Sequence, residues 1–380
     1  MARRGHAIVV LNLPVPDDRR VWAQALALRD AGVDVHVLCQ SMRGHRPGRR
    51  TLDGVHVRYL RTFEGRGLAG VVGEGVWNTL LCLVALPSLA RRRLRSIQVC
   101  NPPDTLFPLL FASRLLGMRT VYDQHDLVPA MASARPGFGK LRGFLELCER
   151  LTVRAADVVL TTSAEQQRRL HDRFGVDATL VRSAPTATFV ASPTSHDGHT
   201  TTLGYLGVVG EQEGLEDLLD AVAVARKQGV DVAVTIAGDG PYLPDVKVHA
   251  SSAGVDDVTT FSGWLQGNEL EEFFASIDAV VVSDPESEYN HHCAMNKVID
   301  AMARGLPVVM RPLHENINLT GEHPWIAHGW SIDDLADAIV SLARSGPEER
   351  ARVGGGLRQR YVETATWDDH RRRYVDAVTA

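Results

Sequence analysis

The sequence predicts an α/β protein built from two parallel-sheet domains, and three observations support this prediction. The chain has 380 residues, which is more than a single hydrophobic core usually serves. Short β-branched runs alternate with amphipathic stretches along its length, as they do where helices connect parallel strands. The alternation forms two series, and a stretch poor in large apolar side chains separates them.

The strands of each series are expected where β-branched runs lie between helical patterns. The first series predicts strands at Ala7–Leu11, Val33–Leu38, Ile97–Cys100, Thr120–Tyr122 and Val158–Thr161. The second predicts strands at Leu203–Leu206, Val232–Ala237, Val258–Phe261, Ala279–Ser283 and Pro307–Met310. The first helix is expected from Arg20 to Ala31, because apolar residues recur there at helical spacing before Gly32.

The two series indicate the domain boundaries. We expect an N-terminal domain at 1–188, a linker at 189–201 and a C-terminal domain at 202–363. The linker is rich in Ser, Thr, Gly and Pro. Residues 364–380 form an amphipathic tail, which needs a partner surface.

Composition excludes several classes of function. The formal net charge of -5 gives no global reason to expect nucleic-acid binding. The five cysteines are far apart and form no C-x-x-C pair, which argues against a zinc site or a secreted disulfide framework and fits the cytoplasm. The start of the chain is expected to be a strand rather than a signal peptide.

Residues Gly75–Ala90 form an apolar stretch followed by Arg91, Arg92, Arg93 and Arg95. We expect it to be too short to span a bilayer. Two alternatives stay open: a buried helix with a solvated basic end, or a patch that contacts a membrane surface.

The segment Tyr289–Val309 carries the most chemical information. Cys293, Ala294 and Met295 precede a helix, so their backbone N–H groups are expected to face an anion. Lys297 in the first turn adds positive charge to the same anion. Asp300 follows one turn later, and its carboxylate can accept two hydrogen bonds from a ribose diol. The alternative for Lys297 and Asp300 is an ordinary solvated ion pair.

Other candidate positions lie at loops after predicted strands. Gly207 and Gly210 suit a backbone that passes close to a ligand, whereas Gly238 is expected to form a tight structural turn. His125 and Asp126 follow a strand at the edge where parallel sheets usually bind ligands.

The segment MNKVIDAMARGLPVV resembles the donor-site signature of glycosyltransferase family 4. The resemblance extends through LPVPDDRRVWAQALALRDAG, CNPPDTLFPL, VYDQHDLVP, GYLGVVGEQEGLEDLLDAV, IAGDGPY and Trp367. It is closest to an actinobacterial-type branch with an M-N-K motif. It implies the GT-B fold, with two Rossmann-like domains facing across a cleft and residues 364–380 crossing back to the N-terminal domain.

The resemblance implies a retaining transferase that uses a nucleotide sugar. Asp300 takes the place of a ribose-binding Glu, and His292 takes the place of the Glu that contacts the donor hexose. Val208 and Glu213 stand where the family carries an Arg and a Lys. The expected catalytic residues are His125, Lys297 and His292. The expected donor contacts are Gly207, Val208, Gly210, Gly238, Trp264, Leu265, Asn290, Cys293, Ala294, Met295, Asn296, Asp300 and Arg182. The expected acceptor contacts are Pro14, Pro16, Arg19 and Asp126.

The implied mechanism is front-face displacement, in which the leaving diphosphate helps to deprotonate the acceptor and no protein nucleophile is needed. We expect no cofactor and no metal, because the chain has no D-x-D pattern between its domains. The expected partners are a nucleotide sugar and a small-molecule or lipid-linked acceptor, with the protein cytoplasmic or peripheral at the inner membrane face. The alternatives are a non-catalytic nucleotide-sugar-binding protein and a sugar-nucleotide epimerase.

Overall fold

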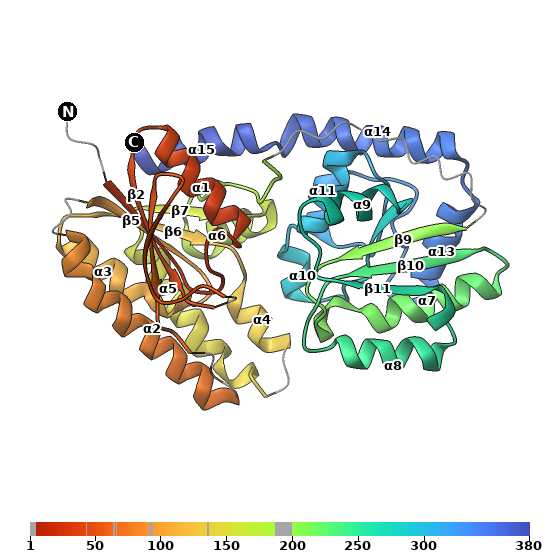
Figure 1. Ribbon diagram of the computed structural model, residues 1–380, viewed down its shortest axis with the longest axis horizontal. Coiled ribbons are helices and arrows are strands. Elements are labelled where there is room, and N and C mark those ends of the chain that lie inside the picture. Colours follow the sequence, from red (N-terminus) through yellow and green to blue (C-terminus); the bar gives the residue numbers. More distant parts are fainter. Residues whose placement is uncertain are drawn as a thin grey trace. The chain divides into compact units, whose positions relative to one another are not determined.

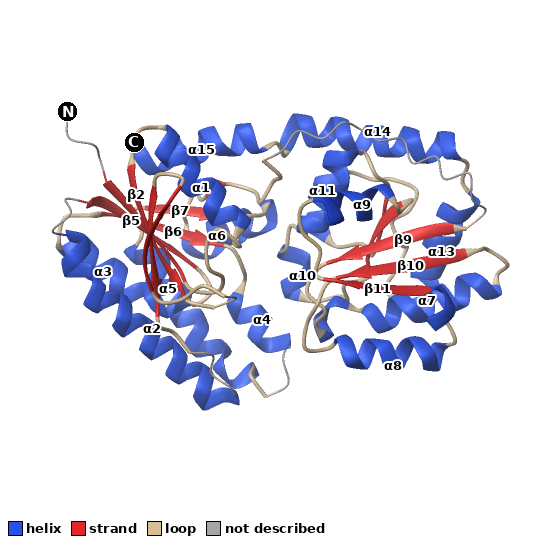
Figure 2. Cartoon of the chain, in the orientation of Figure 1, coloured by secondary structure: helices blue, strands red, loops and turns tan. Residues whose placement is uncertain are grey.

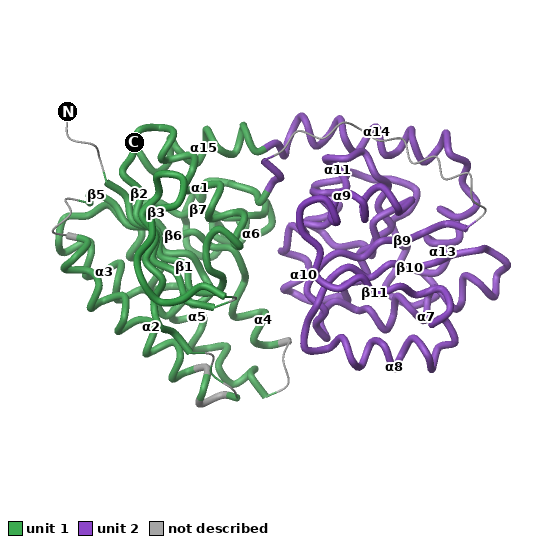
Figure 3. The backbone as a smooth tube through the Cα atoms, viewed as in Figure 1, with its two compact units in different colours: residues 1–183, 367–380 green, residues 184–366 purple. Residues whose placement is uncertain are grey.

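A computed structural model describes residues 5–42, 44–63, 65, 67–90, 94–134, 137–186 and 200–380 (Figure 1). The chain divides into two compact units (Figure 3). Unit 1 comprises Met1–Ser183 and Trp367–Ala380, and unit 2 comprises Ala184–Thr366. Each unit is a largely or wholly parallel sheet with helices packed on it (Figure 2). The predicted α/β class with two parallel-sheet domains is therefore confirmed.

Unit 1 contains an eight-stranded sheet in the order β3-β4-β2-β1-β5-β6-β7-β8. Its strands are β1 (Gly5–Val10), β2 (Asp34–Gln40), β3 (Gly48–Leu52), β4 (Val55–Leu60), β5 (Leu94–Cys100), β6 (Arg119–Gln124), β7 (Val158–Thr161) and β8 (Thr179–Leu180). The antiparallel pair β3–β4 was not predicted. Asp53 and Gly54 connect its strands, and both have positive φ, which is typical of a two-residue hairpin turn.

The helices of unit 1 are α1 (Arg19–Asp30), α2 (Gly67–Ala90), α3 (Phe107–Leu115), α4 (Val128–Ala134), α5 (Arg142–Ala155), α6 (Ala164–Phe174) and α15 (Trp367–Thr379), with short 3-10 turns at Asp104–Leu106 and Gly139–Leu141. Asp18 caps α1, because its side chain accepts a hydrogen bond from the Val21 N–H. Helix α15 packs against α1 and β8, and the buried Tyr374 hydroxyl donates to Gln98 Oε1 at 2.8 Å.

Unit 2 contains a five-stranded parallel sheet in the order β11-β10-β9-β12-β13. Its strands are β9 (Thr201–Leu206), β10 (Val232–Ala237), β11 (Thr259–Gly263), β12 (Ala279–Val282) and β13 (Val308–Met310). Its helices are α7 (Leu215–Lys227), α8 (Leu243–Ala253), α9 (Asn268–Ala275), α10 (Glu288–His292), α11 (Asn296–Arg304), α12 (His314–Thr320), α13 (Ile332–Arg344) and α14 (Pro347–Thr364), with 3-10 turns at Glu211–Glu213 and Asp256–Val258.

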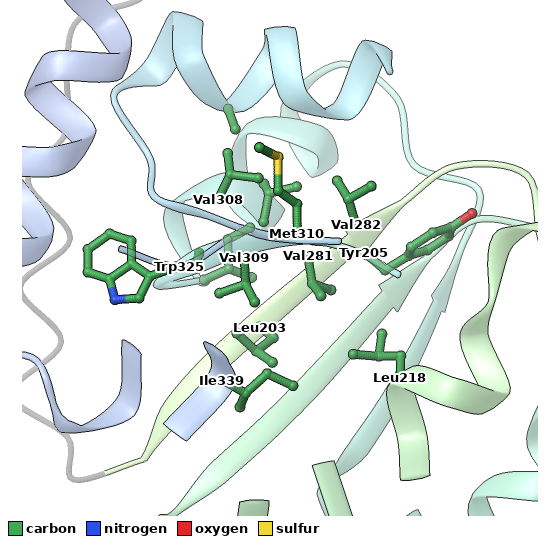
Figure 4. Close-up of a cluster of buried hydrophobic side chains, with 14 of the residues drawn as sticks. Leu203, Tyr205, Leu218, Val281, Val282, Val308, Val309, Met310, Trp325 and Ile339 are labelled. Carbon is green, nitrogen blue, oxygen red and sulfur yellow. The ribbon is translucent and has the colours of Figure 1, made fainter. Parts of the chain in front are cut away.

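The core of unit 2 fills the space between the sheet and its helices. Figure 4 shows side chains from β9, β12 and β13 gathered with Leu218 of α7, Ile339 of α13 and Trp325. Trp325 is fully buried, and the isolated pairing of Ile326 with Met310 continues the sheet beside β13. This core fixes the carboxyl ends of β9 and β12, which carry the candidate site.

Most of the predicted linker, residues 189–199, lies outside the described residues. Strand β9 begins at Thr201, the last residue assigned to that linker.

The apolar stretch predicted at Gly75–Ala90 is longer than expected, because small and apolar residues continue the helix back to Gly67. The prediction that it is too short to span a bilayer is wrong on length, since Val72–Leu89 is long and apolar enough by composition. Cys82 and Leu86 on this helix are buried, whereas Leu80 and Val84 are exposed. Helix α2 therefore packs through one face only.

Candidate functional site

The strand order of unit 2 reverses between β9 and β12, and ligands of such sheets usually bind at this point beyond the carboxyl ends of the strands. The loop after β9 and the loop after β12 meet there. Ser283 Oγ donates to the Glu213 carbonyl at 3.0 Å. A Cβ on Gly214 would lie 2.3 Å from the Ser283 carbonyl oxygen, so only glycine fits this approach.

Lys297 of α11 lies at this junction and is buried. Its Nζ donates to Glu213 Oε2 and to Asp284 Oδ2, each at 3.1 Å. It also lies 4.3 Å from the centroid of the Tyr205 ring. The Tyr205 hydroxyl is within hydrogen-bonding distance of Glu213 Oε2 at 2.8 Å and of the Val208 carbonyl at 2.9 Å. One lysine and two carboxylates therefore share a buried, connected network.

The charges of this network are tightly coupled. Burial raises the pKa of Asp284 to about 7; Lys297 acts against the shift and Glu213 adds to it. Burial disfavours the ammonium of Lys297, but the carboxylates of Asp284 and Glu213 hold its pKa well above the ordinary value. The alternative interpretation, a solvated ion pair between Lys297 and Asp300, does not form, because the Lys297 ammonium is buried and pairs with Glu213 and Asp284 instead.

The start of α11 differs from the expectation in its backbone donors. The Cys293 N–H donates to the Asn290 carbonyl at 3.3 Å, and the Met295 N–H donates to Asn316 Oδ1 at 3.3 Å. These two N–H groups are thus not free, because α10 and α12 supply acceptors for them, and an anion that bound there would have to replace those acceptors. Ala294 lies between them, and Asn296 begins the helix with its side chain exposed.

Two further predicted side chains stabilise the loop before α11. Asn290 is buried, and its Nδ2 donates to the Pro285 carbonyl at 2.8 Å. His292 Nδ1 lies 2.7 Å from the Glu288 carbonyl oxygen.

Asp300 is buried one turn beyond Lys297. Arg304 Nη1 donates to its backbone carbonyl at 3.0 Å and lies 3.5 Å from Oδ1. Arg304 in turn pairs with Glu271 at 2.7 Å. The Asp300 carboxylate is thus oriented by a guanidinium on its own helix.

The glycine-rich loops pack backbone against backbone. A Cβ on Gly238 would lie 1.8 Å from the Gly207 carbonyl oxygen, which explains the glycine in the turn after β10. The space around Gly210 is occupied by the Gln212 amide. Val208 and Trp264 are 49% and 48% exposed. Leu265 follows Trp264 and is partly buried.

In unit 1 a corresponding switch point lies between β1 and β5. Asn101 follows β5, and its Oδ1 accepts from the N–H groups of His125 at 2.6 Å and Asp126 at 3.2 Å. His125 Nε2 lies 3.1 Å from Asp123 Oδ2. Asn101 thus fixes the turn that carries His125 and Asp126.

Asp123 is the centre of a buried polar network. It accepts from Arg20 at 2.6 Å and from Gln24 at 2.7 Å. Burial opposes its ionised form, but Arg20 and His125 hold the pKa of Asp123 well below its ordinary value. Arg20 is therefore structural here. Cys100, Asp123 and His125 also offer metal-ligand atoms within 4.8 Å of one another.

The remaining predicted residues lie in the same unit. Pro14 is buried and Pro16 is exposed in the loop before α1, and Arg19, the first residue of α1, is exposed. Arg182 is buried, and its Nη1 donates to the Thr162 carbonyl at 3.4 Å. Arg182 belongs to unit 1 rather than to the unit that carries Lys297.

The sequence interpretation missed Glu213, Asp284 and Tyr205 as partners of Lys297. Asp284 follows a buried strand, and a carboxylate at the end of such a strand is a signal that could have identified it. Glu213 and Tyr205 gave no such signal.

Comparison with known families matches both units. Residues 18–186 match the family described as "Glycosyl transferase 4-like domain", and residues 200–345 match "Glycosyl transferases group 1".

Curated relatives are about a quarter identical to the chain over the segments that align. It is 27% identical over 229 residues to a GDP-mannose-dependent alpha-(1-6)-phosphatidylinositol monomannoside mannosyltransferase of Mycobacterium tuberculosis, covering 56% of this chain and 58% of that protein. It is 26% identical over 106 residues to a 2-deoxystreptamine glucosyltransferase of Streptomyces kanamyceticus, covering 28% and 26%. The matched segments therefore span less than two thirds of these relatives.

Solved structures share the fold over nearly the whole chain. A sucrose-phosphate synthase of Thermosynechococcus elongatus aligns with a TM-score of 0.81 at 16% identity, over 98% of this chain and 97% of that one. Anabaena HepE in complex with UDP-glucose aligns with a TM-score of 0.73 at 14% identity, over 99% of each chain. At such identities the likeness establishes the fold alone.

Proposed function

Because the chain belongs to the group 1, family-4-like glycosyltransferases with the GT-B fold, we propose that it moves a sugar from a nucleotide sugar to a small-molecule or lipid-linked acceptor. The resemblance of its α11 segment to the family signature makes retention of the anomeric configuration part of the proposal. The actinobacterial-type branch, and a role in cell-surface glycan or secondary-metabolite biosynthesis, belong to the proposal as well.

The observation that supports donor binding most is the buried Lys297 at the switch point between β9 and β12. A diphosphate is costly to bury without cationic or N–H partners. Lys297 is a cation of suitable placement, and Asp300 follows one turn later as the proposed ribose acceptor. The exposed Val208 and Trp264 offer apolar surface for a nucleoside base.

Catalysis in the proposed mechanism comes from charge stabilisation and orientation. The leaving diphosphate accepts the acceptor proton as the new glycosidic bond forms on the same face, so no protein nucleophile is required. His125, held beside the ionised Asp123, is the proposed contact to the donor sugar. His292 replaces the acidic contact to the hexose, which favours an unusual donor sugar.

On the acceptor side, some relatives are named for lipid acceptors and others for small molecules. For this chain we propose either class, with Pro14, Pro16, Arg19 and Asp126 as contacts. We also propose peripheral contact with the inner membrane face near the basic end of residues 75–95. Arg91, Arg92 and Arg93 lie outside the described residues, and Arg95 is exposed on β5.

The proposal is tested in two steps. Thermal shift with UDP, GDP, dTDP and ADP identifies the base, because a ligand at a hundred times its Kd adds about 2.7 kcal/mol of stability. The matching nucleotide sugar is then incubated with candidate acceptors, and release of nucleoside diphosphate is measured together with the anomeric configuration of the product.

Lys297→Ala should raise the Kd for the nucleoside diphosphate at least about tenfold, or about 1.4 kcal/mol. Lys247→Ala on the exposed side of α8 is the matched control and should bind as the parent does. Unchanged binding by Lys297→Ala would remove this lysine from the donor site.

A non-catalytic nucleotide-sugar-binding protein is the second candidate, because Val208 and Glu213 replace two cations of the family and Lys297 is already paired with carboxylates. Nucleotide binding without any glycoside product would favour it. An epimerase would instead convert the donor sugar without an acceptor.

A further inference from the structure

Helix α2 presents an apolar face to solvent. Its exposed large side chains are Val72 at 43%, Val76 at 56%, Trp77 at 43%, Leu80 at 52% and Val84 at 78%. At about 100° per residue these positions fall on one side of the helix. In a monomer such a continuous exposed apolar surface usually marks a contact site.

The helix carries almost no charge that would keep this face in water. Glu74 is the one charged residue between Gly67 and Ala90, and it accepts a hydrogen bond from the Gly65 N–H at 2.9 Å. The Trp77 indole donates to the Arg61 carbonyl at 3.2 Å while its ring stays partly exposed. A tryptophan with one polar contact and an exposed ring suits the boundary between water and lipid.

A basic pocket of about 220 Å³ lies at the carboxyl end of the same helix. Ser88 and Leu89 of α2 line it together with residues of β2, β3 and β4. The strand register sets Arg49 opposite Arg58. These residues belong to the β3–β4 hairpin, so the hairpin and the end of α2 build the pocket together.

The charges in the pocket favour an anion. The side chains of Arg49 and Arg58 have no hydrogen-bond or ion-pair partner within the described parts of the chain. His36 and His56 lie 3.2 and 3.5 Å from Asp34, so that carboxylate is paired with the imidazoles. Arg58 lines the pocket together with Ser88 and Leu89, which places its charge beside the carboxyl end of α2.

We propose that this surface of unit 1 docks on an anionic lipid bilayer, with a headgroup phosphate in the Arg49–Arg58 pocket and the exposed face of α2 among the acyl chains. Two arginine side chains can donate charge-assisted hydrogen bonds to the oxygens of one phosphate group. An apolar helix face with cations at one end matches the interfacial mode of membrane binding. The inference deepens the membrane contact in the proposed function by naming the surface and the lipid chemistry.

A second copy of the chain is a weaker match for this surface. In a two-fold pair each α2 face meets the same face, and each arginine pocket then lies on an interface that offers one acidic side chain, Glu74, from that helix. An anionic bilayer supplies both the negative charge and the apolar phase.

The test is vesicle sedimentation of the full chain without any donor, so that its outcome is independent of sugar transfer. Vesicles of phosphatidylglycerol and phosphatidylcholine in equal parts are compared with phosphatidylcholine alone. We expect clear preference for the anionic vesicles, and weaker binding as salt rises. Arg49→Gln and Arg58→Gln should each lower the partition coefficient about fivefold, and Leu80→Ser with Val84→Ser about tenfold or more.

Two matched controls should leave binding unchanged: Arg168→Gln, an exposed arginine on α6, and Val248→Ser, 71% exposed on α8. Circular dichroism checks that each variant is folded. Excess glycerol 3-phosphate should reduce vesicle binding only modestly if acyl contact contributes, and abolish it if the pocket takes a free phosphate alone. Three results would each overturn the proposal. They are loss of all vesicle binding in glycerol 3-phosphate, equal binding to both vesicle types, and a dimer in light scattering that Leu80→Ser dissociates.

Discussion

Glu213→Gln should tighten the binding of a nucleoside diphosphate. The Nζ of Lys297 donates to Glu213 and to Asp284 at 3.1 Å each, so its charge is already balanced by two carboxylates. A diphosphate that binds Lys297 must therefore compete with Glu213 for the same ammonium. The amide of Gln keeps the shape and an oxygen acceptor but removes the negative charge.

The expected magnitude follows from the geometry. Glu213 Oε2 lies 3.1 Å from Nζ. A phosphate oxygen at a charge-assisted distance from the same nitrogen would lie about 5–6 Å from that carboxylate, where an effective dielectric of about 20 gives roughly 3 kcal/mol of repulsion. The Glu213 side chain is 18% exposed, so water screens part of this term. About 1.4 kcal/mol, or about tenfold in Kd, is the expected gain.

Isothermal titration with the nucleoside diphosphate selected by thermal shift measures this gain. Glu211→Gln is the matched control, since Glu211 belongs to the same short turn and is exposed. Its affinity should equal that of the parent. If Glu213→Gln binds the nucleotide as weakly as the parent or more weakly, Glu213 does not compete with the ligand, and Lys297 is not the cation that holds it.

Four other outcomes are expected. Burial raises the folded pKa of Asp284 above the ordinary 3.8, to about 7, so the free energy of unfolding falls as pH rises through that window, and Asp284→Asn should flatten this fall in thermal melts. Asp300→Asn should weaken nucleotide binding without unfolding unit 2; a nucleotide complex with the ribose hydroxyls turned away from it would contradict the role. His125→Gln should lower the rate of transfer but leave nucleotide affinity unchanged, with the exposed His171→Gln as control. Deleting 364–380 should impair transfer more than nucleotide binding. It should also lower the free energy of unfolding of unit 1 by about 3–5 kcal/mol, because buried Tyr374 and Val378 leave its core; an unchanged melting temperature would refute this loss of stability.

The two sheets could be predicted from the sequence because their strands are continuous apolar runs. Strands such as β1 and β10 are buried along most of their length, and they consist mostly of the apolar residues that such burial requires. The β3–β4 hairpin was missed although Asp53-Gly54 is a strong turn signal. Strand β3 shows no apolar alternation, because its first four residues are all exposed. Strand β4 does alternate, with Val55, Val57 and Tyr59 buried, so its pattern was a signal that the interpretation overlooked.

The start of α11 could also be predicted, since it depends on a local change from polar loop to amphipathic helix. Helix α2 was predicted in part. Its glycine-rich beginning does not resemble a helix by propensity, and packing of Gly75 against Thr105 is a tertiary contact that the sequence does not reveal.

Local sequence patterns could not identify the partners of Lys297, since Glu213 is 84 residues away from it in the sequence and Asp284 is 13. They meet only because β9 lies beside β12 in the folded sheet. This arrangement changes the electrostatics of the proposed donor site. Where the resemblance implies cations, the protein has one lysine held between two acids. An anion that enters must therefore displace a carboxylate from Lys297 or bring a proton to Asp284, whose pKa near 7 makes that proton available in neutral solution.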